Sequence, residues 1–109
     1  MNPGERQTIE ELAARALVPY AERPGADGVA QLVDDLMTEG QKLHAAVSRL
    51  PLARRTERAG AALAEWTYFA EAGPLSDGDH AAWNHARGLA RILRILASVL
   101  HETQPSSLQ

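Results

Sequence analysis

Residues 82–100 read AWNHARGLARILRILASVL, and apolar side chains recur in this stretch at alternating intervals of four and three residues. The repeat comprises Ala82, Ala86, Leu89, Leu93, Leu96 and Leu100. Such spacing places one apolar stripe along an α-helix, and helices with this stripe pack side by side at a small left-handed crossing angle. The stretch therefore predicts a long helix that faces the core of a helical bundle.

Two further segments carry the same repeat. One consists of Val29, Val33, Leu36, Gly40, Leu43, Val47 and Leu50, and the other of Leu52, Thr56, Ala59, Leu63, Trp66 and Ala70. We expect helices over 27–49 and 52–72, separated by Pro51, because proline ends a helix. A third long helix is expected after the Gly73-Pro74 turn, from an N-cap at Ser76 to about residue 102.

A shorter helix is expected at the N-terminal end. Thr8 and Glu11 form a capping-box pattern, and Pro19 ends or kinks the helix near Val18. The predicted fold is an all-α, antiparallel up-down four-helix bundle with three long helices and a short, kinked N-terminal helix. We expect residues 8–102 to form the single domain, between a flexible N-terminus at 1–7 and a flexible C-terminal tail at 103–109.

Composition narrows the classes of function. The 109 residues carry a net charge of −3 and no cysteine, which excludes disulfides and thiol chemistry. We expect no nucleic-acid partner at this charge, and no apolar run approaches the roughly 18 residues that span a bilayer. The first residues lack the apolar core of a secretory signal, so the expected location is cytoplasmic.

No pattern in the chain carries recognisable catalytic or metal chemistry. A glycine-rich phosphate loop and a Gly-x-Ser-x-Gly elbow are both missing. Asp77 and His80 are three residues apart, but paired Glu-x-x-His and His-Glu-x-x-His motifs are absent. His85 falls on the inward face of its helix, as expected of a core histidine. We expect no enzyme, no catalytic residue, no metal and no cofactor.

Basic side chains form two candidate partner-binding groups. Arg87, Arg91 and Arg94 share one helix face, whereas Arg54, Arg55 and Arg58 lie near the joint at Pro51. Arginine fits phosphates or an acidic protein partner. The alternative is that these arginines form ion pairs within the bundle, with Glu10 and Glu11 as the compensating charges.

Aromatic side chains form another candidate site, at one end of the bundle. Tyr20, Trp66, Phe69 and Trp83 could wall a pocket for a small apolar molecule. The alternative is that they fill the widest part of the core.

The run His85-Ala-Arg-Gly-Leu-Ala-Arg, with Leu50-Pro51, Arg58-Ala59 and the Gly-Pro turn before it, resembles a group of short uncharacterised actinobacterial helical proteins. These are loosely labelled natural-product biosynthesis proteins. The resemblance covers roughly residues 29–102 and assigns no functional residue. Of the eleven lysine and arginine residues, Lys42 is the only lysine. GC-rich genomes favour arginine over lysine in this way.

We therefore expect a non-enzymatic protein-interaction or regulatory module that acts through a helical face. The alternative is a bundle that binds a small molecule at its aromatic end. Because the first helix is too short to cover the groove of three long ones, we also expect a homodimer.

Overall fold

The computed structural model describes residues 1–103 of the chain and contains four α-helices. They are α1 (Pro3–Ala16), α2 (Ala26–Ser48), α3 (Glu57–Ala72) and α4 (Asp79–Thr103), with single 3₁₀ turns at Tyr20–Glu22 and Leu52–Arg54. The described part of the chain has no strand, so the predicted all-α fold is confirmed. Of the predicted tail, residues 104–109 lie outside the described residues.

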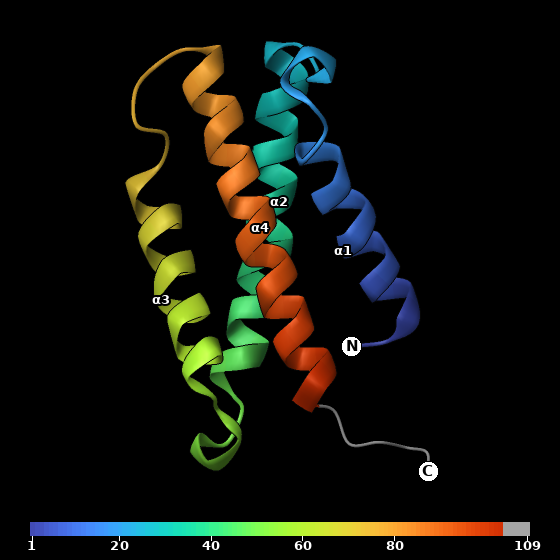
Figure 1. The fold of residues 1–109 in the computed structure, drawn as a ribbon, viewed down its shortest axis with the longest axis vertical. Coiled ribbons are helices and arrows are strands. Elements are labelled where there is room, and N and C mark those ends of the chain that lie inside the picture. The colour runs from blue at the N-terminus through green and yellow to red at the C-terminus, as the bar shows by residue number, and fades with distance from the viewer. Residues whose placement is uncertain (104–109) are drawn as a thin grey trace.

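The central pair of helices is α2 and α4, which run in the same direction (Figure 1). The helices α1 and α3 flank this pair on opposite sides and run the other way, and each of them packs against both α2 and α4. Consecutive helices are therefore antiparallel, as an up-down bundle requires. The molecule measures 46 × 26 × 19 Å along its principal axes.

The predicted stripe of α4 forms the centre of the core. Leu89, Leu93 and Leu96 are completely buried, and Ala86 lies among them. On α2, Leu32 is buried whereas Val33, which the sequence repeat included, is only half-buried. Because α2 packs against three neighbours, it buries a wider face than a single four-three stripe.

The predicted start of α3, at residue 52, is wrong. The helix α3 begins at Glu57, and Thr56 is its N-cap. The Thr56 hydroxyl accepts a hydrogen bond from the Ala59 amide at 3.1 Å. The preceding residues form a 3₁₀ turn, and Leu52 is 80% exposed rather than part of the apolar stripe. With 16 residues in α3 and 14 in α1, the bundle has two long and two short helices.

The first helix begins earlier than the Thr8 capping box predicts. Asn2 is the N-cap of α1, in a capping box with Glu5, and Pro3 occupies the first turn. Thr8 lies inside the helix and donates its hydroxyl to the Gly4 carbonyl. Residues 3–7, which the sequence analysis placed outside the domain, thus form the first turns of α1.

The connection from α3 to α4 is longer than expected. The helix α4 begins at Asp79, so Ser76 is not its N-cap. Gly73 and Gly78 take φ values of 68° and 112°, which side chains other than glycine rarely adopt. The two glycines are the first and last residues of the loop 73–78, which connects α3 to α4.

Candidate functional site

The structure gives the three α4 arginines different surroundings. Arg87 donates to the carbonyl oxygens of Val18 at 2.8 Å and Ala16 at 3.4 Å, and so satisfies the C-terminal end of α1. Arg94 forms an ion pair with Glu10 at 2.7 Å. Arg91 is exposed. The three side chains therefore do not form one uniform binding face.

The three arginines near Pro51 are divided in the same way. Arg55 donates to the Ser48 carbonyl at 2.6 Å and closes the C-terminal end of α2. Arg58 forms an ion pair with Glu102 at 3.2 Å, whereas Arg54 is exposed. Four of the six candidate arginines therefore have partners within the chain. Glu10 compensates one of them, as the alternative interpretation required.

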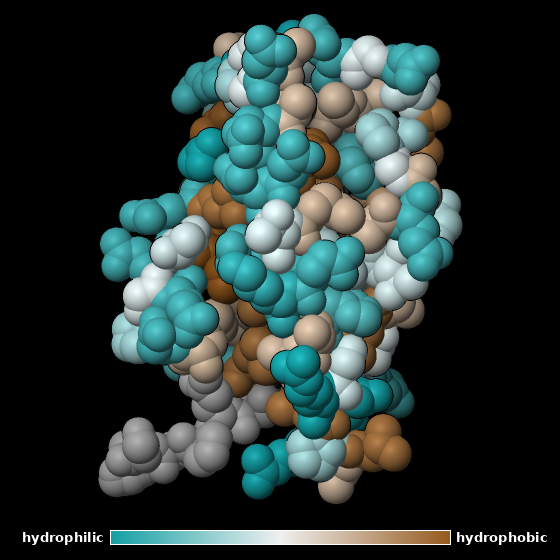
Figure 2. Space-filling model, turned by 180° about the vertical axis from the view of Figure 1, so that it is seen from behind, coloured by the Kyte–Doolittle hydropathy of each residue, from teal (hydrophilic) through white to brown (hydrophobic). Residues whose placement is uncertain are grey.

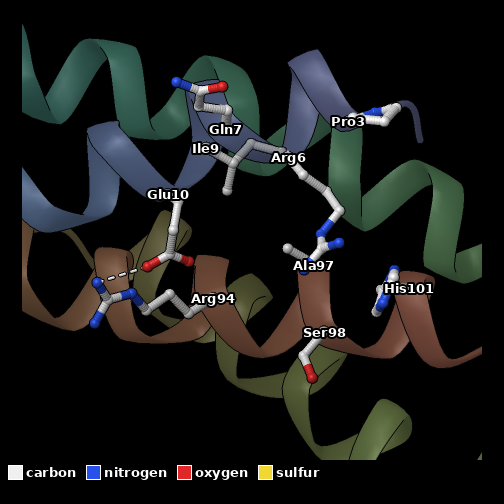
Figure 3. Close-up of a pocket in the computed structure, with 9 residues that line it drawn as sticks. All are labelled: Pro3, Arg6, Gln7, Ile9, Glu10, Arg94, Ala97, Ser98 and His101. Atoms are coloured by element: carbon white, nitrogen blue, oxygen red, sulfur yellow. Dashed lines mark ion pairs between the residues drawn. The ribbon is translucent and has the colours of Figure 1, made fainter.

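A polar cleft lies between the first half of α1 and the last turns of α4 (Figure 3). It has a volume of about 420 Å³, and the Glu10–Arg94 pair closes one end. Arg6 extends from α1 toward Ala97, and His101 lies further along α4. Arg6 has no ion pair with any residue that the structure describes. The cleft therefore combines the guanidinium of Arg6 with the paired charges of Glu10 and Arg94.

The two tryptophans of the predicted aromatic site are core residues. Trp66 and Trp83 are each 1% exposed, and the Trp66 ring lies directly against Gly40 of α2. Tyr20 is exposed, with the Arg23 guanidinium 3.8 Å from its ring centre and His80 beside it. The structure therefore does not bring the four aromatic residues together around one cavity.

Phe69, the fourth member, does line a pocket, which we call the α3–α4 pocket. It has a volume of about 380 Å³ and lies under the 73–78 loop. Its lining residues are Tyr68, Phe69, Ala72, Gly73, Pro74, Leu75, Ser76, His80, Ala81, Asn84 and His85. Most of these residues were not predicted as site residues from the sequence. Only the conformation of the loop brings the end of α3 over the start of α4.

His85 is the buried polar group of the α3–α4 pocket. It is only 7% exposed, and its ring lies nearly parallel to Phe69, with ring centres 6.1 Å apart. The imidazole makes no hydrogen bond to any described residue, although it lines the pocket. Burial lowers the pKa of His85 below its ordinary value, which favours the neutral ring. A neutral imidazole can donate one hydrogen bond and accept another.

Comparison with known proteins identifies the family. The model of a family of unknown function, DUF6415, matches residues 7–105. The chain belongs to this family. No curated protein and no solved structure matches it.

None of the helices within 1–103 is long and apolar enough to cross a membrane. In the same part of the chain, no three His, Asp or Glu side chains are grouped so that they could hold a metal ion.

Proposed function

We propose that the protein is a binding module without catalytic activity, and that it holds a small apolar molecule in the α3–α4 pocket. The observation that carries this proposal is the pocket itself, with the buried imidazole of His85 in its wall. Its volume of about 380 Å³ lies in the range of pockets for small ligands.

The composition of the walls supports a ligand of this kind. Phe69, Pro74, Leu75 and Ala81 present apolar surface, and Leu75 is 98% exposed. An apolar ligand that covers part of Leu75 would remove apolar surface from water, at roughly 25 cal/mol per Å². His85 would orient the ligand, because a buried polar group gains most from a hydrogen bond when water is excluded.

A fluorescent apolar compound tests the proposal. N-phenyl-1-naphthylamine is neutral at pH 7, and its emission rises in apolar surroundings. We expect saturable binding to the parent chain and at least a tenfold loss of affinity in Ala81→Leu, because the added carbons occupy pocket volume. Ala30→Leu is the matched control, since Ala30 is an exposed alanine of α2 outside the pocket. Equal affinity for parent and Ala81→Leu contradicts the proposal.

The cleft between α1 and α4 supports a second candidate function, the recognition of an acidic protein segment. Arg6 is the observation that favours it, because its guanidinium faces the cleft without an ion pair to any described residue. A hexaglutamate peptide is a suitable test ligand. We expect Arg6→Gln to weaken its binding and Arg91→Gln to leave it unchanged. Equal loss in both variants shows only a diffuse charge effect and contradicts a site.

Other expectations from the sequence stay predictions. The resemblance to actinobacterial proteins labelled for natural-product biosynthesis supports a small organic ligand, and the neighbouring genes of the source organism test it. Cell fractionation of that organism tests the cytoplasmic location. The expected homodimer is tested by light scattering.

A further inference from the structure

We propose that the ligand of the α3–α4 pocket is an organic cation, a protonated amine attached to an apolar body. This inference rests on the proposed function and specifies its ligand class. It combines the apolar walls and buried His85 with the charges that surround the pocket opening.

Three carboxylate residues are adjacent in sequence to the pocket lining, one before the 73–78 loop, one within it and one directly after it. Glu71, Asp77 and Asp79 are sequence neighbours of the lining residues Ala72, Ser76 and His80, respectively. All three carboxylate residues are exposed, and none has an ion pair with a residue in the described part of the chain. The opening therefore carries negative charge that no basic side chain of the described bundle neutralises directly.

The nearby basic residues have other contacts. Arg87 donates to two carbonyl groups at the end of α1. Arg23 lies over the ring of Tyr20, which in turn contacts His80. Arg54, Arg55 and Arg58 lie at the joint between α2 and α3, at the opposite end of the molecule (Figure 1). Because the bundle is elongated, these three arginines are several Debye lengths away at physiological salt and do not compensate the opening.

The aromatic side chains of the pocket also suit a cation. Tyr68 is 68% exposed, and its ring meets Phe69 edge-on, with ring centres 6.1 Å apart. The face of an aromatic ring attracts a cation, because the ring carries partial negative charge on its face. The neutral imidazole of His85 does not repel an ammonium group, and its unprotonated nitrogen can accept a hydrogen bond from one.

Three naphthalene derivatives that differ in charge test this inference. They are 1-naphthylmethylammonium, neutral 1-naphthalenemethanol and 1-naphthoate, whose shared ring separates the effect of charge from that of apolar contact. We expect the parent chain to bind the cation about tenfold more tightly than the alcohol, and the anion most weakly, because charge attraction adds to burial of the ring. The preference should shrink as salt is raised.

Charge-neutralising variants locate the effect. In Asp77→Asn/Asp79→Asn, the preference for the cation over the alcohol should fall to about threefold or less, while the affinity for the alcohol stays the same. The control is Asp34→Asn, an exposed carboxylate of α2 outside the pocket. Circular dichroism of each variant checks that the bundle is folded.

The outcomes separate the two proposals. If the cation and the alcohol bind equally to the parent chain, the cation inference is wrong and the pocket remains a site for apolar molecules. If none of the three compounds binds the folded parent chain, both the inference and the proposed function are wrong. A preference that persists unchanged in Asp77→Asn/Asp79→Asn also overturns the inference.

Discussion

His85 shows what the sequence can predict about a single residue. Its place on the inward face of α4 predicts burial, and the structure confirms burial at 7% exposure. Its position in the wall of a pocket could not be predicted, because Phe69 and the 73–78 loop, which complete the pocket, depend on the path of the chain between two helices.

The lowered pKa of His85 predicts how stability changes with pH. The unfolded chain takes up a proton near the ordinary histidine pKa of about 6.5, whereas the folded chain takes it up at lower pH. Stability from this group is therefore complete above pH 6.5 and is lost as the pH falls through the window below it. We expect urea midpoints between pH 7.5 and 5 to fall less in His85→Gln than in the parent. An unchanged fall in the variant contradicts this assignment.

The arginines show where residue-level prediction fails. Arg87 and its acceptor Val18 are 69 positions apart, and Arg58 and Glu102 are 44 apart. Helical periodicity places a side chain on a face of its own helix, but it does not say which groups of another helix lie opposite. The sequence therefore predicted the exposed stripe and left open whether its charges bind a partner or each other.

Among the helices, the apolar repeats predicted the existence of α2, α3 and α4 and their order. The predicted starts of α1, α3 and α4 were wrong, because several capping signals compete in this chain. Thr8 and Glu11 fit the capping-box pattern, but α1 begins at the capping box of Asn2 and Glu5. The N-cap of α3 is Thr56, which follows a 3₁₀ turn. Local hydrogen bonds decide such choices, and residue spacing alone does not.

Two glycines inside helices predict opposite responses to alanine. A Cβ at Gly40 would overlap the buried ring of Trp66, whereas a Cβ at Gly60 meets no other atom within 4 Å. We expect Gly40→Ala to destabilise the fold by about 1–3 kcal/mol, because a packed indole cannot shift freely. Gly60→Ala should stabilise it by about 0.5–1 kcal/mol through helix propensity. Urea denaturation of both variants measures the difference, and equal changes would contradict the packing described.

The contact between Arg87 and the end of α1 makes a second prediction for the elements. Replacing Arg87 by glutamine removes the charged donor from two carbonyl groups, and we expect a loss of about 1–3 kcal/mol in unfolding free energy. Arg91→Gln is the matched control, because Arg91 lies one turn further along α4 and is exposed. Its effect should stay within about 0.5 kcal/mol. Similar losses in both would place Arg87 among the ordinary surface residues.

At the scale of the whole molecule, the reason given for a homodimer needs revision. The apolar repeat of α2 is buried or half-buried within one chain. On the face seen in Figure 2, hydrophilic side chains cover much of the surface and hydrophobic ones show among them. A surface of small residues stays open on the first half of α3, where Ala61 and Ala64 are exposed beside Gly60.

The homodimer stays a prediction on that surface. We expect light scattering to give about twice the chain mass of 11.8 kDa, and Ala61→Glu/Ala64→Glu to give a single chain. A charged side chain on a close helix contact would be buried without a partner, which is costly. A mass of one chain for the parent at every concentration would exclude the dimer.

Ligand binding in the α3–α4 pocket is tested most directly by NMR of the four histidines during titration with 1-naphthalenemethanol. They report on separate regions, because His85 and His80 line the α3–α4 pocket, His101 lines the α1–α4 cleft, and His44 lies beside Thr67. We expect saturable shifts of the His85 and His80 ring signals, while those of His44 and His101 stay in place. Unchanged His85 signals at saturating ligand, or shifts largest at His101, would contradict binding in this pocket.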